Sequence, residues 1–290
     1  MSEVAELDLG AFDDTVLVFG GPYGNLEATG ALLEEGARLK IPPRRMICTG
    51  DVAAYCADPV ATAGLLRAAN IATLMGNCEE ALGFGGDDCG CGFEDGSACD
   101  LLADHWYRYS NAVLDEECRA WMRGLPRRIR FALGGARLAV VHGGASAINR
   151  FMFASSSGAD FAAELTLAGA GGVIAGHSGI PFTRVDPGDG PLWHNAGAIG
   201  MPANDGTPRV WYSLLRPAPD GVEIKHRALA YDHAAAARKM RSADLPEGYA
   251  DCLSSGLWPS LDVLPTPERR NTGKALAEET YFWKPVPARA

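Results

Sequence analysis

The stretch VLVFGGPYGNLEATGALLEEG, from Val16 to Gly36, decides the fold class. Four apolar residues run into a pair of glycines, which predicts a buried strand followed by a sharp turn. Leucines then recur at helical spacing, and Asn25 is a suitable N-cap for that helix. In open α/β sheets, functional residues usually lie at the end of such a strand. Here the turn reads GGPY at positions 20–23, without a strong acid, base or metal ligand.

The alternation of strand and helix patterns continues downstream. RRMICTGD (44–51) and IATLMGN (71–77) are predicted strands, and PVATAGLLRAAN (59–70) is a predicted helix that opens at a proline. This βαβαβ order implies an α/β fold with a parallel sheet and crossover helices. Further strands are predicted at 138–144, 171–179, 190–200, 208–216 and 221–231, and further helices at 114–126 and 232–245.

The composition limits the classes of partner. The chain has 290 residues, a formal net charge of −10 and 47% apolar residues, as expected for a globular protein rather than one that binds nucleic acid or an anionic membrane. The acidic start lacks the pattern of a signal peptide, so we expect a cytoplasmic protein. Residues 1–252 are predicted to form one domain, and 253–290 a proline-containing extension packed on it. Whether the protein forms a homo-oligomer is left open.

Polar residues follow several of the predicted strands. These residues are Asp51, Asn77, His142 and His177. The carboxyl ends of neighbouring strands meet at one edge of a sheet, and a carboxylate, an amide and two imidazoles form a suitable coordination sphere for a divalent metal. One such residue alone would be ordinary turn chemistry, but four in one chain favour a site.

The order of the motifs carries a resemblance to a known family. The motifs are GGPYGNLEA, GDVAAYCADP, GNCEEAL, VVHGG, GHSGIPF and HNAGAIGMPANDGTPRVWYS. Over about residues 15–250 the chain resembles the calcineurin-like metallophosphoesterase superfamily, and within it the small bacterial phosphodiesterase and diadenosine-tetraphosphatase-related branch. The resemblance implies a four-layer αββα sandwich of two mixed β-sheets flanked by helices, with the site at the strand ends.

The resemblance matches one metal subsite and not the other. It implies that the retained ligands are Asp51, Asn77, His142 and His177. The private ligands of the second subsite are replaced by Gly21, Tyr23 and Gly179. The pattern therefore implies one divalent transition metal, with Mn, Fe, Zn and Ni all open, or a site rebuilt around a different second occupant.

Two functions are consistent with this degenerate site. The first is a hydrolase of a phosphate ester or anhydride with weak or atypical activity, because one metal cannot clamp both the attacking and the leaving oxygen. The candidate catalytic residues are Cys78, which replaces a catalytic histidine of the family, and Tyr23 and His194. The alternative is a non-catalytic pseudoenzyme that binds such a ligand, or a soft metal or metalloid, through a cysteine-rich loop.

The cysteine-rich loop leaves three interpretations open. Cys78, Cys89, Cys91 and Cys99 lie close together in the sequence, within or on either side of the Gly- and Asp-rich segment 83–97. They could form a second, thiolate site for a soft metal, which is the hypothesis most relevant to function. They could instead be inert buried thiols, or Cys89 or Cys91 could form a disulfide with Cys99.

Overall fold

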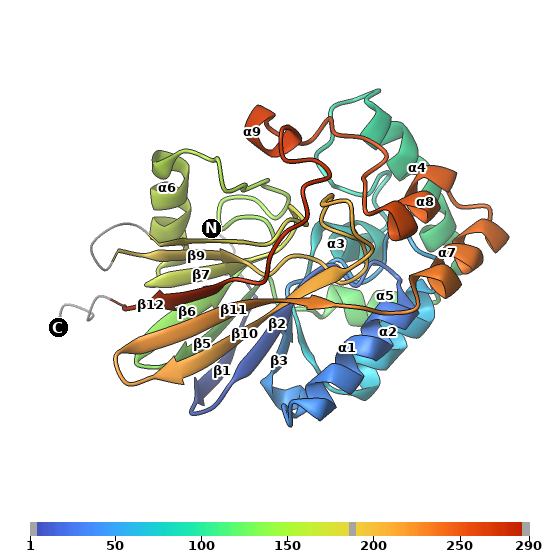
Figure 1. Ribbon diagram of the computed structural model, residues 1–290. Helices are drawn as coiled ribbons and strands as arrows, with labels where there is room; N and C mark the ends of the chain where they lie inside the picture. The colour runs from blue at the N-terminus through green and yellow to red at the C-terminus, as the bar shows by residue number, and fades with distance from the viewer. Residues whose placement is uncertain (1–4, 186–189, 286–290) are drawn as a thin grey trace.

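Two six-stranded sheets form the centre of the computed structural model, which describes residues 5–185 and 190–285 (Figure 1). The first sheet has, in spatial order, β1 (Glu6–Phe12), β5 (Arg128–Leu133), β6 (Ala136–Val140), β7 (Gly172–Ala175), β9 (Leu192–Asn195) and β8 (Phe182–Val185). The second has β12 (Thr280–Trp283), β11 (Gly221–Leu229), β10 (Val210–Ala218), β2 (Val16–Phe19), β3 (Met46–Cys48) and β4 (Ala72–Thr73). Both sheets are mixed.

Helices flank the two sheets. They are α1 (Leu26–Arg38), α2 (Pro59–Ala68), α3 (Asn77–Phe84), α4 (Ala98–Val113), α5 (Glu116–Arg123), α6 (Gly158–Ala168), α7 (His233–Ser242), α8 (Glu247–Ser255) and α9 (Thr266–Arg269). Figure 1 shows α6 on the side of the first sheet, and α1, α2 and α7 beside the second. Within the described residues, no helix combines the length and the apolar character needed to cross a bilayer.

Strand β2 shows why the layers form. All four of its side chains are buried, and they alternate between two apolar clusters. Val16 and Val18 pack between the sheets, whereas Leu17 and Phe19 pack under the helices of the second sheet. A third cluster, which includes Phe161 of α6, packs that helix on the first sheet. Three buried interfaces separate four layers, which confirms the predicted αββα sandwich.

The parallel pairing of β2, β3 and β4 matches the predicted βαβαβ unit, but β1, β5, β8 and β12 were not anticipated from the sequence. Strand β1 has an acidic, mostly exposed sequence and pairs in parallel with β5 at the edge of its sheet. Such a strand lacks the apolar pattern that local sequence reasoning uses, because its stability depends on pairing rather than on burial.

The chain after residue 252 contributes to both the sheet and the region of the site. Helix α8 runs across residues 252 and 253. The predicted domain boundary at residue 253 stays a prediction. Strand β12 pairs antiparallel with β11, and Trp283 is fully buried between the two sheets. Figure 1 shows the red segment crossing from α9 to β12 along the molecule. Residues of this extension also line the cavity described below.

We expect Trp283→Ala to destabilise the protein by about 3–5 kcal/mol, because it leaves a large cavity between the sheets. The indole Nε1 also donates to the carbonyl of Gly190 at 3.0 Å, and that bond would be lost. Urea unfolding measures the change. The matched control is Phe282→Ala in the same strand, which is 55% exposed and should change stability by about 0.5 kcal/mol or less. If Trp283→Ala lowers stability by no more than Phe282→Ala does, β12 contributes nothing to the core.

Candidate metal centre and adjoining cavity

Four donor side chains meet where strands of both sheets end. Asp51 follows β3 and Asn77 begins α3 after β4, whereas His142 and His177 follow β6 and β7. The Nε2 atom of His142 lies 3.1 Å from Oδ2 of Asp51 and 3.0 Å from Oδ1 of Asn77. It lies 3.2 Å from Nδ1 of His177, which in turn is 4.0 Å from Oδ2 of Asp51. The structure therefore brings all four predicted ligands together.

The spacing of these atoms fits a metal ion. With metal–ligand bonds of about 2.1 Å, neighbouring ligand atoms of a tetrahedral site lie about 3.4 Å apart. The observed separations of 3.0, 3.1, 3.2 and 4.0 Å bracket that value. Within the described residues, Asp51, His142 and His177 form the single group of three or more histidine, cysteine or acidic side chains with converging ligand atoms.

The ring of His142 is oriented for binding a cation. Its Nδ1 lies 2.7 Å from the carbonyl oxygen of Thr49, which can only accept, so Nδ1 carries a proton. In the neutral ring, Nε2 then presents a lone pair toward the oxygen atoms of Asp51 and Asn77. A cation between these three atoms, either a proton on Nε2 or a metal ion, removes their mutual repulsion. This arrangement, with one nitrogen bonded to a carbonyl, is typical of metal-binding histidines.

The charges of the group reinforce each other. Burial alone would raise the pKa of Asp51, but the positive charges and hydrogen bonds of His142 and His177 lower it below its usual range. Burial lowers the pKa of His177. Burial also acts to lower the pKa of His142, but the carboxylate of Asp51 outweighs it, and the pKa of His142 is raised. Asp51 is therefore a buried anion at neutral pH.

Glu79 is a positioning residue that the sequence reasoning missed. Its buried carboxylate accepts hydrogen bonds from the backbone nitrogens of Asp51 and Val52, both at 2.7 Å, and of Gly76 at 2.9 Å. These bonds hold the turn in which Asp51 has a φ of 58°. Burial and the charge of Asp51 raise the pKa of Glu79 to about 7. The available signal was a glutamate three residues after Gly76, the capping-box spacing at the start of α3.

Two asparagines orient the ligand loops. The Nδ2 of Asn77 donates to the carbonyl of Cys89 at 2.9 Å, which directs its Oδ1 toward His142. The Nδ2 of Asn195 donates to the carbonyl of Gly176 at 2.7 Å and to Oγ of Ser178 at 2.9 Å. Gly176 and Ser178 flank the predicted ligand His177 in the chain, so Asn195 fixes the loop that carries His177.

Aromatic rings fill the place of the second subsite. A Cβ atom added to Gly21 would lie 2.3 Å from Cζ of Tyr23, so the tyrosine ring occupies the space of any side chain there. A Cβ on Gly179 would lie 3.3 Å from Cζ2 of Trp258, a residue of the C-terminal extension. The two rings replace ligands that the family resemblance would place at these positions.

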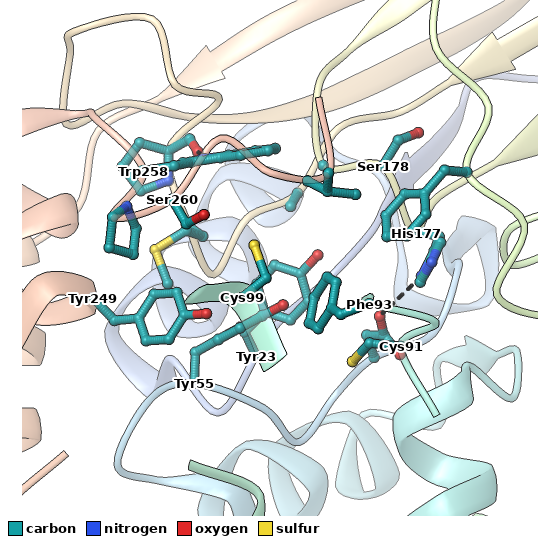
Figure 2. A pocket seen from close by; sticks show the side chains of 18 residues that line it. Tyr23, Tyr55, Cys91, Phe93, Cys99, His177, Ser178, Tyr249, Trp258 and Ser260 are labelled. Carbon is teal, nitrogen blue, oxygen red and sulfur yellow. Dashed lines mark hydrogen bonds and ion pairs between the residues drawn. The ribbon is translucent and has the colours of Figure 1, made fainter. Parts of the chain in front are cut away.

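A cavity of about 70 Å³ adjoins the donor group, and Asp51 and His177 form part of its wall. Its aromatic lining consists of Tyr23, Tyr55, Phe93, Phe151, Tyr249 and Trp258. Figure 2 shows Trp258 across the cavity from Tyr55 and Tyr23. Among its described lining residues there is no lysine or arginine. Arg150 pairs with Asp160, and Arg184 lies over the ring of Phe161, so neither of these arginines lines the cavity.

Cys78 is placed behind the site rather than in the cavity. It is 1% exposed and does not line the cavity, and its backbone nitrogen donates to Oδ1 of Asp51 at 3.2 Å. Burial, together with the charges of Asp51 and Glu79, raises the pKa of its thiol well above the usual value. The residue thus supports a ligand through its backbone, while its side chain stays a neutral thiol.

The cysteine loop combines a disulfide that the sequence did not suggest with free thiols, since Cys78 and Cys99 are buried and unpaired with another cysteine. Cys89 and Cys91 form a disulfide with each other, a pairing made accessible by Gly90, which has a φ of 62°. Cys99 is free and lines the cavity. Among the described residues, no group of three converging ligand atoms includes these sulfur atoms. The thiolate site therefore stays a prediction.

His194 lies in the core and not in the cavity. It is 0% exposed on β9, and its Nδ1 is 2.9 Å from Oγ1 of Thr183. The same hydroxyl lies 2.8 Å from Nε2 of His226 on β11, so the two histidines share one threonine. Burial lowers the pKa of both rings, to about 4 for His226. This arrangement is a neutral polar cluster between the sheets.

Comparison with known proteins supports the fold. No family model and no curated protein matches the chain. A metallophosphoesterase from Sphaerobacter thermophilus matches with a TM-score of 0.64 and 22% identity, over 84% of this chain and 99% of that one. The chain has the metallophosphoesterase fold. A hypothetical protein from Pyrococcus horikoshii matches with a TM-score of 0.69 and 17% identity, again over 84% and 99% of the two chains.

Because His226 is buried, we expect the stability of the protein to fall in acid. In the unfolded chain its pKa returns to about 6.5, so between pH 6.5 and about 4 the unfolded state binds more protons and stability falls as pH falls. From pH 6.5 to 5 this single group should cost about 2 kcal/mol. Urea unfolding at these two pH values should show a smaller loss for His226→Gln. The exposed His105→Gln should behave like the parent protein, and an equal loss in all three would contradict the assignment.

Proposed function

We propose that the protein binds one divalent metal ion through Asp51, Asn77, His142 and His177 and hydrolyses a small phosphate ester or anhydride. The observation that carries this proposal is the convergence of the four donor atoms at the carboxyl edge of both sheets, within 3.0–4.0 Å of one another along the measured pairs. When bound, the metal would supply a Lewis acid that polarises the phosphoryl group. The similarity in fold to a metallophosphoesterase supports the reaction class.

Tyr23 would provide a hydrogen bond to the phosphoryl group. Its ring occupies the place of the second subsite, and its hydroxyl has no hydrogen-bond partner among the described residues. Burial and the nearby charge of Asp51 raise its pKa well above the usual value, so the phenol keeps its proton at neutral pH. A neutral donor aimed at a developing oxyanion stabilises the transition state without a second ion.

A second candidate function is binding without catalysis. It is favoured by the same rings of Tyr23 and Trp258, because they lie close to Gly21 and Gly179, where the resemblance would place ligands of a second metal. In that case the metal and the cavity would hold a phosphorylated ligand without cleaving it. The two functions differ in whether hydrolysis depends on Asp51.

Asp51→Asn should remove both metal and hydrolysis. We expect about one equivalent of transition metal in the parent protein by elemental analysis, and much less in the variant, because a buried anionic ligand is lost. Cleavage of bis(4-nitrophenyl) phosphate should fall by at least about 10³-fold. The control is Asp87→Asn, an exposed acid of the loop, with unchanged metal and rate. Hydrolysis that survives Asp51→Asn would place the activity elsewhere, and metal binding without any hydrolysis would favour the second function.

Tyr23→Phe should lower kcat by about 10²-fold while metal content and stability stay near those of the parent protein. The ring that fills the space is retained, so the change isolates the hydroxyl. The control is Tyr107→Phe, which removes a hydroxyl bonded to the carbonyl of Gly86 at 2.7 Å, outside the cavity. An unchanged kcat in Tyr23→Phe would limit Tyr23 to filling space.

A further inference from the structure

The cavity is placed to receive a substituent of whatever the donor group holds. Asp51 and His177 belong both to the donor group and to the cavity wall, so the two spaces are continuous. The ring of Phe151 connects them, with its centroid 4.2 Å from that of His177. A volume of about 70 Å³ holds roughly five water molecules, which is the space of one compact organic group.

The aromatic walls are built at steep angles to one another. Tyr55 is at the centre: its ring lies 4.8 Å from that of Tyr23 at 89°, and 4.7 Å from that of Tyr249 at 54°. Trp258 lies on the opposite side of the cavity (Figure 2). Two hydrogen bonds fix it there. Its Nε1 donates to the carbonyl of Pro202 at 2.7 Å, and its backbone nitrogen donates to Oδ1 of Asn204 at 2.9 Å. The walls are thus rigid before any ligand arrives.

The polar character of the cavity is negative rather than positive. The hydroxyls of Tyr23, Tyr55 and Tyr249 have no hydrogen-bond partner among the described residues, and each oxygen can accept a contact from a ligand. The one charged carboxylate in the wall is that of Asp51, and among the described lining residues there is no cationic side chain to receive a second phosphate. A long polyphosphate therefore finds no charge partner here.

We propose that the cavity binds a quaternary ammonium group, so that the substrate is a small phosphate ester of a choline-type alcohol. Several aromatic faces around a compact cation are the recognised solution for such ligands, because the ring quadrupoles attract a charge that cannot donate hydrogen bonds. The polarised N-methyl groups also make weak contacts to hydroxyl oxygens. This substrate class rests on the proposed function, since the phosphoryl group would lie at the metal.

A neutral group of the same shape is the competing occupant, and charge separates the two. Choline and 3,3-dimethylbutanol have nearly the same shape, but only choline carries a positive charge. An apolar cavity would hold both equally well or prefer the neutral alcohol, which is less costly to desolvate. An aromatic cage should prefer choline by about tenfold.

The first experiment measures binding of these two phosphate-free probes to the metal-loaded full chain by calorimetry. We expect choline to bind about tenfold more tightly than 3,3-dimethylbutanol, and Trp258→Leu to remove the preference. The control Trp121→Leu, which changes a partly buried tryptophan on α5 outside the cavity, should keep it. Equal affinities, tighter binding of the neutral alcohol, or no measurable binding of either probe would overturn the proposal.

The second experiment compares hydrolysis of phosphocholine and 3,3-dimethylbutyl phosphate. A kcat/KM about tenfold higher for phosphocholine would extend the binding preference to the substrate. If neither ester is cleaved but choline binding shows the preference, the hydrolase function fails and the ammonium site stands. If both esters are cleaved at equal rates and the probes bind equally, the hydrolase function stands and the ammonium site is overturned.

Discussion

The buried carboxylate of Asp51 constrains the architecture around it. A buried charge costs several kcal/mol unless it is paired and hydrogen-bonded. Here a second buried carboxylate, that of Glu79, holds the backbone of Asp51 and adds to the negative charge. The two imidazoles and the amide that face Asp51 come from three other strand ends, so both sheets must be in register before the charge is compensated. Under the proposed function, a divalent cation would complete that compensation, and metal affinity would then depend on correct packing of the sandwich.

The second half of the site is rebuilt and not merely lost. In place of ligands, the chain has glycines at 21 and 179 with aromatic rings above them. One of these rings comes from the strand–helix turn and the other from the C-terminal extension. The rings line a cavity that is continuous with the donor residues Asp51 and His177. Under the proposed function, replacing the second set of ligands with rings would weaken two-metal chemistry and would provide a binding surface for an organic substituent.

Local sequence predicted the parts of the fold that are apolar and short in range. Strand β2 and its following helix could be read directly, because buried parallel strands are continuous apolar runs. The motif order led to the αββα sandwich and to the four donor residues, since parallel strand ends meet at one edge. Glu79 was missed, although its capping-box spacing was visible, because a helix cap and a support for a metal ligand have the same sequence pattern.

The sequence by itself determined the fold class and the identity of the donor group. Only the tertiary structure decided which other residues reach that group. His194 follows a strand as the ligands do, yet its side chain lies between the sheets beside Thr183. Trp258 is distant in sequence from every motif, yet it forms a wall of the cavity. The reason is physical: periodicity encodes which face of an element is buried, whereas contacts between distant segments depend on how packed layers and loops fit in three dimensions.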